Sequence, residues 1–211
     1  MRTALPYILF LTAPTPAAAL LGARLSHCLE LAERPCADGT LPRGLVADIG
    51  CDHGYLAAEL ADRGRTVAAV DVAEAPLDGC RRHFAERGLE PAAYVLGDGV
   101  VAVQADERLG FCETAIVAGV GPRTASSVVE GACAGPAPPP RRFVLQPAQC
   151  WIGNMRSLRE TLASNGYGVA EERWLDDNGP NQRPNGRRLL VTIRADRDAA
   201  AAPSETELLV G

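Results

Sequence analysis

The chain alternates between short apolar runs and longer stretches in which apolar residues recur at helical spacing. The clearest unit begins with LVADI at 45–49, passes through a glycine turn and continues as the helix LAAELADRG at 56–64. Further runs of the same buried type follow, separated by helical stretches or loops. We therefore expect strands at 45–49, 66–71, 92–96, 114–121 and 142–147, and helices at 23–33, 56–64, 74–87, 124–133 and 155–166.

The last part of the chain has a different pattern. Residues 167–175 and 186–195 are predicted as two strands that flank a turn rich in Gly, Pro and Asn at 178–186, an arrangement typical of antiparallel pairing. The earlier alternation of strands and helices favours parallel pairing. We therefore predict an α/β fold, a Rossmann-like doubly wound seven-stranded sheet that is mostly parallel with an antiparallel final strand pair. In such a sheet the ligand lies beyond the carboxyl ends of the strands.

The length and the two end segments set the predicted domain division. A chain of 211 residues forms one core, so we expect a single domain over 23–195. Residues 1–22 carry one early arginine and an apolar run, which indicates a targeting segment or an N-terminal extension, and residues 196–211 form a tail. Prolines within 1–22 oppose a secretory signal. We expect a cytoplasmic protein, or a plastid or mitochondrial one if 1–22 are a transit peptide.

Composition removes several chemistries. All 21 basic residues are arginine, so P-loop lysines, Schiff bases to pyridoxal phosphate and kinase lysines are excluded. The net charge of −5 opposes nucleic-acid binding by the molecule as a whole and leaves only local arginine patches. The seven cysteines have neither a C-x-x-C pair nor zinc spacing, so we interpret them as reduced thiols, mostly in the core. Neither a metal site nor a membrane partner is expected.

The loop after the first strand carries the most specific chemistry. In a dinucleotide-binding loop the second glycine of G-x-G-x-x-G lets a pyrophosphate approach the backbone. Here the register Gly50, Asp52, Gly54 places an acid at that position. A carboxylate repels a diphosphate and attracts a cation, so the loop suits a ligand whose nearest group is an ammonium. S-adenosylmethionine has such a group and no phosphate, and a nicotinamide-dependent oxidoreductase is correspondingly disfavoured.

Two more acids follow successive strands. Asp71 closes the second strand, about where a carboxylate accepts hydrogen bonds from ribose hydroxyls in nucleotide-binding sheets. Asp98 follows the third strand and can accept from an adenine amino group. Each alone is more often an N-cap or turn residue, but three acids at three successive strand ends are a more specific signal.

Several blocks of the sequence resemble the bacterial tRNA (adenine(22)-N1)-methyltransferase family (TrmK). They are VADIGCDHGYL, AVDVAEAPLDGC, RGLEP, LGDGV, IVAGVG, FVLQP and LRETLASNGYGV, with RLSHCLELAE matching the opening helix of that family. The resemblance covers about residues 23–195. It implies a class I methyltransferase fold, S-adenosylmethionine as cofactor and methylation of N1 of an adenine in tRNA. It further implies a cofactor site formed by Asp48, Gly50, Asp52, His53, Gly54, Tyr55, Asp71, Asp98 and Gly99.

The resemblance weakens at the loops that would face the target base. The family usually has G-M-G-G after the fourth strand and L-Q-P-N after the fifth, whereas this chain has GVGP at 119–122 and LQPA at 145–148. Gly119, Gly121 and Gln146 of these loops are the candidate catalytic residues, and Gln146 would accept a bond from the adenine amino group. His53 has two interpretations, a catalytic imidazole or a helix N-terminal residue bonded to backbone.

Contacts with RNA are less well defined by the sequence. The family continues into a helical hairpin that grips tRNA, and this chain stops where that segment begins, so either the sequence is truncated there or RNA is held differently. Trp151 and Trp174 are candidates for base stacking, with core packing the more common role. Two rival functions stay open, a related methyltransferase with another substrate and a non-catalytic S-adenosylmethionine-binding module. Six arginines are candidates for phosphate contact, although solvated surface positions are favoured: Arg141, Arg142, Arg156, Arg159, Arg187 and Arg188.

Overall fold

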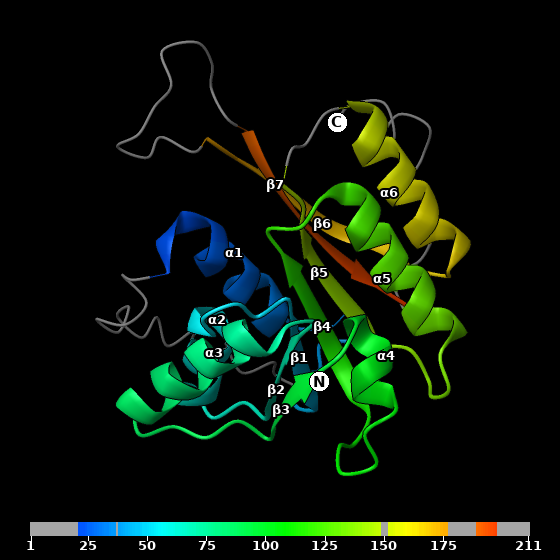
Figure 1. The fold of residues 1–211 in the computed structure, drawn as a ribbon. Coiled ribbons are helices and arrows are strands. Elements are labelled where there is room, and N and C mark those ends of the chain that lie inside the picture. The colour runs from blue at the N-terminus through cyan, green and yellow to red at the C-terminus, as the bar shows by residue number, and fades with distance from the viewer. Residues whose placement is uncertain (1–20, 37, 149–151, 177–188, 198–211) are drawn as a thin grey trace, which may run out of the picture.

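The computed structural model describes residues 21–36, 38–148, 152–176 and 189–197. A seven-stranded sheet has the order β3-β2-β1-β4-β5-β7-β6 (Figure 1). Strands β1 to β5 pair in parallel, and β7 pairs antiparallel with both β5 and β6, which confirms the predicted fold class. The strands are β1 (Leu45–Ile49), β2 (Val67–Asp71), β3 (Ala93–Leu96), β4 (Cys112–Ala118), β5 (Arg142–Gln146), β6 (Gly168–Asp176) and β7 (Leu189–Asp196).

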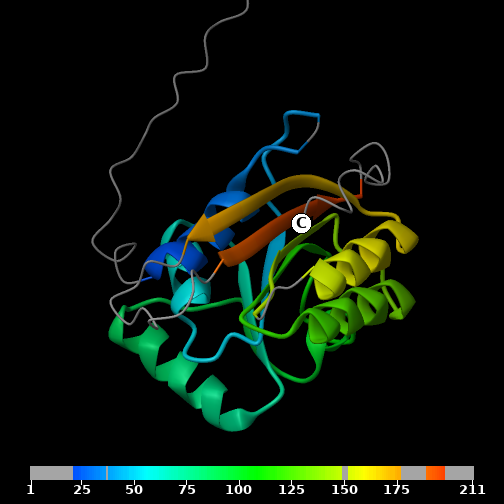
Figure 2. The ribbon, with the colours of Figure 1, turned by 90° about the horizontal axis from the view of Figure 1, so that it is seen from above.

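Helices cover both faces of the sheet. In both views α1, α2 and α3 lie on one face and α4, α5 and α6 on the other (Figures 1 and 2). None of the helices that the structure describes is long and apolar enough to cross a membrane. The helices are α1 (Gly22–Glu33), α2 (Tyr55–Asp62), α3 (Glu74–Glu86), α4 (Gly99–Gln104), α5 (Pro122–Ala134) and α6 (Ile152–Ser164).

Alternate residues of each central strand enter two separate cores. In β5, Phe143 and Leu145 pack with the helices α4 to α6, whereas Val144 between them packs with α1 to α3. Because successive side chains of a strand point to opposite faces, a strand buried on both faces is apolar throughout. This is why the central strands appear in the sequence as continuous apolar runs.

Most predicted elements are present with shifted ends, and one helix was missed. β4 begins at Cys112, two residues before the predicted strand, and α6 begins at Ile152 instead of 155. No element was predicted over 99–104, where the structure has α4. Its six residues, GVVAVQ, are too few to reveal a helical period and are rich in β-branched valine, which favours strands in isolation. The predicted turn at 178–186 and the end segments 1–20 and 198–211 lie outside the described residues, so the domain division stays a prediction.

Arg142 of β5 anchors the C-terminus of α1. The guanidinium forms a two-pronged ion pair with Asp196 of β7, with Nε to Oδ1 at 2.8 Å and Nη2 to Oδ2 at 3.2 Å. It also donates to carbonyl oxygens at the end of α1, among them Ala32 at 3.1 Å and Arg34 at 2.6 Å. Helix α1 has no basic residue in its own last turn, so Arg142 supplies the positive charge that a helix C-terminus favours.

The arginine interpretation therefore needs correction at two positions. Arg142 is 1% exposed and Arg159 is 2% exposed, so neither is a solvated surface residue or available to a phosphate. Arg159 of α6 pairs through Nη2 with Glu172 of β6 at 2.6 Å. Packing of helices onto the sheet, which no local pattern reveals, buried both. Arg187 and Arg188 lie outside the described residues.

Replacing Arg142 should strongly destabilise the fold. Arg142→Met leaves the buried Asp196 with only the longer contact to Arg194, at 3.5 Å, and leaves the α1 carbonyls without this donor, so we expect a loss of about 3–5 kcal/mol in the free energy of unfolding. Urea unfolding followed by circular dichroism measures it. The control Arg156→Met removes an exposed pair with Glu160 and should change stability by about 0.5 kcal/mol or less. A loss below about 1 kcal/mol for Arg142→Met would contradict the anchoring role.

Candidate functional site

The predicted site residues gather at the carboxyl edge of the sheet, around the junction of β1 and β4. These neighbouring parallel strands lead to helices on opposite faces, α2 after β1 and α5 after β4, so their ends diverge and leave a crevice position. The loops after β1 and β4 approach each other there, since a Cβ on Gly50 would lie 4.0 Å from Cγ1 of Val120. Doubly wound folds bind their ligands at this kind of junction.

The loop after β1 has an unusual backbone. Gly50 and Gly54 have φ of 71°, and Asp52 between them has φ of 49°, the only positive φ among the described non-glycine residues. Aspartate tolerates this left-handed region better than most residues, and the strain is typical of functional loops. A Cβ on Gly54 would overlap Sγ of Cys80 in α3, so the turn into α2 requires glycine. The loop consequently presents the carboxylate of Asp52, which is largely exposed, above β1.

Asp71 ties this loop to the end of β2. Its Oδ2 accepts from the backbone N–H of Asp52 at 3.2 Å and its Oδ1 accepts from that of Ala73 at 3.1 Å. The side chain is mostly buried, with 9% exposure. A carboxylate has about four acceptor positions, so two stay open for a ligand. Asp71 therefore shapes the loop and keeps capacity for hydroxyl donors.

The ends of β2 and β3 combine exposed apolar side chains with a carboxylate. Val72 is 69% exposed and Leu96 is 57% exposed, which is unusual for residues next to buried strands. Asp98 is exposed and stands at the N-cap position of α4 without a side-chain capping bond, so the N-cap interpretation explains its place but not its side chain. Gly99 follows with a φ of 61°. Val72 and Leu96 were not singled out from the sequence, because exposure of a strand-end apolar residue is decided by packing.

Asp48 is buried at the end of β1, beside Ala69 of β2 and Ile116 of β4. Burial, to which the nearby Asp71 adds, raises the pKa of its carboxyl to about 7 against the lowering effects of the Ala57 N–H and of Arg24. Desolvation disfavours the charged form of an acid, which is the dominant cause here. A cation placed beside this carboxyl would strongly favour its charged form.

The loops after β4 and β5 are joined. The backbone N–H of Gly119 donates to the carbonyl of Gln146 at 2.9 Å, and that of Ala148 donates to the carbonyl of Val120 at 2.7 Å. Gly119 has a φ of 81°, whereas Gly121 has an ordinary φ of −66° as the N-cap of α5. The three candidate catalytic residues are thus brought together as one unit. The side chain of Gln146 is buried, and its Nε2 donates to the carbonyl of Pro147 at 2.9 Å.

Arg24 of α1 is a site residue that the sequence analysis missed. Its Nη1 donates to Oε1 of Gln146 at 2.9 Å, and a Cβ on Gly119 would lie 2.9 Å from the same Nη1. The first turn of α1 therefore reaches the junction of β1, β4 and β5. The resemblance block RLSHCLELAE begins at this arginine, but nothing in the local pattern distinguishes it from a solvated helix residue.

His53 and Tyr55 lie on the outer side of the loop. The His53 side chain is 57% exposed, its Nε2 is 3.8 Å from Oδ1 of Asp52, and its ring packs against Gly79 of α3. The Tyr55 ring stands edge-on to that of His83 with centroids 4.7 Å apart. No backbone bond to the His53 ring is among the contacts of the described part of the chain. Trp151 and the side chain of Trp174 lie outside it.

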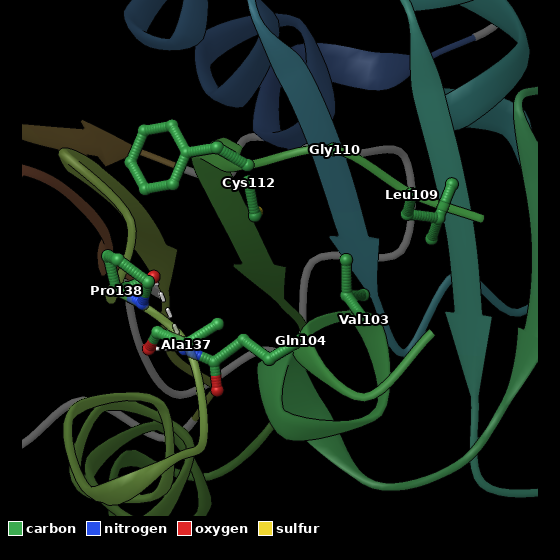
Figure 3. A pocket seen from close by; sticks show the side chains of 8 residues that line it. Val103, Gln104, Leu109, Gly110, Cys112, Ala137 and Pro138 are labelled. Carbon is green, nitrogen blue, oxygen red and sulfur yellow. Dashed lines mark hydrogen bonds between the residues drawn. The ribbon is translucent and has the colours of Figure 1, made fainter. Parts of the chain in front are cut away.

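A separate pocket lies at the opposite edge of the sheet. It has a volume of about 360 Å³ and is formed by the end of α4 and the loops that precede β4 and β5. Figure 3 shows Gln104 reaching across it toward Ala137 and Pro138, whose carbonyl oxygens accept from its Nε2 at 2.9 and 3.4 Å. None of the predicted site residues lines this pocket. Within the described ranges no group of three His, Cys, Asp or Glu residues is placed to hold a metal ion.

Several solved structures have a similar fold. M. capricolum TrmK, in complex with S-adenosyl-homocysteine, has a TM-score of 0.70 and 17% identity over 89% of this chain and 74% of that one. A putative tRNA (m1A22) methyltransferase of Streptococcus pneumoniae, in complex with S-adenosyl-L-methionine, has a TM-score of 0.67 and 21% identity over 88% and 76%. The magnesium protoporphyrin IX methyltransferase of Synechocystis PCC 6803 follows with a TM-score of 0.58 and 20% identity over 82% and 81%.

Sequence comparisons give the family. A ubiquinone biosynthesis O-methyltransferase of Stutzerimonas stutzeri is 40% identical over 63 residues, which are 30% of this chain and 27% of that enzyme, so the match spans about a quarter of that relative. The family model described as "Methyltransferase domain" matches residues 37–181, more than half of the chain. The chain therefore belongs to this methyltransferase domain family and has the fold of S-adenosylmethionine-dependent methyltransferases, which confirms the cofactor predicted from the sequence.

Proposed function

We propose that the protein transfers the methyl group of S-adenosylmethionine to N1 of an adenine in tRNA. The observation that carries this proposal is the joined unit of Arg24, Gly119 and Gln146, in which the opening helix meets the loops after β4 and β5. The fold similarity to M. capricolum TrmK extends over 89% of the chain, and a putative tRNA (m1A22) methyltransferase of Streptococcus pneumoniae has a similar fold. The blocks IVAGVG and FVLQP, which resemble that family, lead into these two loops, and the loops themselves differ from it as GVGP and LQPA.

The side chains around β1, β2 and β3 match the parts of the cofactor in order. Asp52 and the buried Asp48 would attract its ammonium group, with Gly50, His53, Gly54 and Tyr55 completing that loop. Asp71 would accept from the ribose hydroxyls through its open acceptor positions. Asp98, with Gly99, would accept from the adenine amino group. The exposed Val72 and Leu96 would cover the adenine ring, which explains why apolar side chains stand open there.

Bound S-adenosylmethionine supplies an electrophilic methyl group on its sulfonium. The residues of the chain have to align the target nitrogen with it and exclude water, because an in-line displacement depends on positioning. Adenine N1 has a free lone pair, so no side chain needs to remove a proton before attack. Positive charge develops on the base, and Gln146 Oε1 and the backbone of the loop with Gly119 and Gly121 would have to supply acceptors for it, although the Gly121 carbonyl already accepts from the N–H of Ala125 at 3.0 Å. Oε1 already accepts from Arg24, which makes Gln146 chiefly a support of the loop.

The proposed tRNA contact must rely on local charge, since the molecule carries a net charge of −5. Of the arginines singled out from the sequence, Arg141 and Arg156 stay partly exposed, with side-chain exposures of 39% and 55%. Both also lie near carboxylates, at 4.0 Å from Asp38 and 3.0 Å from Glu160 respectively. A phosphate would have to compete with these pairs, which are weak at an exposed surface.

A second candidate function is methylation of a hydroxyl oxygen of a small molecule. It is favoured by the 40% identity with the O-methyltransferase of Stutzerimonas stutzeri over 63 residues. Such an acceptor needs a base to take its proton, and His53 and Asp52 are exposed titratable side chains of the cofactor loop. In the first candidate the loops after β4 and β5 would hold an adenine base, and in the second they would hold a small hydroxyl compound. The methyl acceptor therefore has to be identified by experiment.

Methyl transfer to tRNA tests the proposal. We expect the purified chain with tritiated S-adenosylmethionine to label a tRNA transcript with adenine at position 22, and nuclease mapping to place the label there as 1-methyladenosine. A transcript with guanine at that position is the matched control and should stay unlabelled. Labelling of a phenolic acceptor instead would favour the second candidate, and cofactor binding without labelling of either would favour the binding-module alternative.

Removing the Asp71 carboxylate should weaken every ligand that contains the nucleoside. For Asp71→Ala we expect about 10–100-fold weaker binding of S-adenosylhomocysteine and of 5′-methylthioadenosine by calorimetry, because both carry the ribose. Asp78→Ala, which removes an exposed carboxylate paired with Arg81 on α3, is the control and should leave both affinities unchanged. Unchanged affinities for Asp71→Ala would contradict the ribose assignment.

Asp48 should make stability depend on pH in a defined direction. Its pKa of about 7 in the fold exceeds the unfolded value of about 3.9, so between these values the native state binds more protons and stability falls as pH rises, levelling off above pH 7. Asp48→Asn cannot ionise and escapes this loss. We expect it to exceed the wild type at pH 8 by on the order of 2 kcal/mol in urea unfolding, with the difference shrinking toward pH 5. Equal differences at both pH values would mean that Asp48 titrates normally.

A further inference from the structure

Arg24 differs from most of the half-buried and buried arginines in its partners, and among the described residues it shares this only with Arg65, whose Nη2 donates to the carbonyl of Gly44 at 3.4 Å. Arg63, Arg87, Arg142 and Arg159 each pair with a carboxylate within 3.4 Å. Arg24 is half-buried, and within the described part of the chain it forms one hydrogen bond, from Nη1 to the neutral amide of Gln146, and no ion pair with a carboxylate. A guanidinium has five N–H donors, and withdrawing it from water without an anion is unfavourable. The remaining donors of Arg24 are therefore available to an anionic group.

The position of Arg24 limits what that anion can be. Its Nη1 occupies the place where a Cβ of Gly119 would stand, so the guanidinium lies directly against the loop after β4. Its charge also reaches Asp48 at the end of β1, where it opposes the rise in the carboxyl pKa. Arg24 thus stands near the ends of β1, β4 and β5.

The charges around the junction form a complementary pair of sites. The exposed carboxylate of Asp52 suits an ammonium, the carboxyl of Asp48 would gain charge beside one, and Arg24 is a cation that suits a carboxylate. The methionine end of S-adenosylmethionine carries these two groups on one carbon atom. A guanidinium binds a carboxylate through parallel N–H donors in a fixed plane, a geometry that lysine cannot reproduce. Gln146 holds one end of the guanidinium, so the plane is fixed before a ligand arrives.

We propose that Arg24 binds the α-carboxylate of S-adenosylmethionine and that Gln146 positions its guanidinium for this contact. The proposal concerns the cofactor and does not depend on the identity of the methyl acceptor. It gives α1 a direct part in the site in addition to covering the sheet. It also explains why the loop after β4 has glycine at 119, because any larger residue would displace the guanidinium.

The test compares two ligands that differ only in the carboxylate. S-adenosylhomocysteine and its decarboxylated counterpart, S-adenosyl-3-thiopropylamine, are titrated into the full chain by calorimetry without tRNA. For the wild type we expect the first ligand to bind about 10–100-fold more tightly. For Arg24→Met we expect that ratio to fall to about threefold or less, because only the carboxylate-bearing ligand loses a partner.

Controls separate this role from a structural one. Arg108→Met removes an exposed arginine at the opposite edge of the sheet and should keep the wild-type ratio. Gln146→Leu should reduce the ratio in part, and Arg24→Lys should restore only part of it. Equal weakening of both ligands by Arg24→Met would show that Arg24 merely holds α1 in place and would overturn the proposal. If Arg24→Met fails to fold, equal affinity of the wild type for the two ligands would overturn it on its own.

Discussion

The anchoring of α1 by Arg142 is the constraint on which the site depends. One buried guanidinium joins β5, β7 and the last carbonyls of α1, and its ion pair with Asp196 makes its burial tolerable. The C-terminus of α1 is thereby fixed at one edge of the sheet. A rigid helix transmits that placement along its length, so the first turn of α1, with Arg24, reaches the opposite edge where the ligand loops lie.

At that edge, three loops depend on one another. Asp71 fixes the loop after β1 by accepting from the backbone of Asp52, and the loops after β4 and β5 share two backbone hydrogen bonds. Arg24 completes the arrangement, because it donates to Gln146 and its guanidinium lies against Gly119, which has no side chain. The charged groups are therefore separated across the junction. The carboxyls of Asp48 and Asp52 lie at the end of β1, and the guanidinium of Arg24 lies at the ends of β4 and β5. Preorganised groups of this kind lose little freedom when a ligand binds.

The buried Asp48 shows how the site trades stability for affinity. A carboxyl held away from water has its pKa raised to about 7, which lowers the stability of the ligand-free fold near neutral pH. A cationic ligand group beside it would reverse part of that loss. The left-handed backbone of Asp52 is likewise an unfavourable feature that the surrounding strands hold in place. Asp52 is the only non-glycine residue with a positive φ among the described residues, and both it and Asp48 lie where the ligand is expected.

The sequence by itself determined the layered fold and the order of the acids along it. Apolar runs separated by helical stretches require a parallel sheet, and the carboxyl ends of parallel strands meet at one edge, so acids after successive strands had to gather there. Only the tertiary structure decided which arginines are buried, which apolar strand ends stay open and which residue of α1 enters the site. In the local sequence pattern Arg24 and Arg142 look like ordinary exposed arginines, and Val72 looks like an ordinary apolar residue. For the two arginines these roles come from contacts between segments more than 50 positions apart, and no local periodicity encodes such contacts.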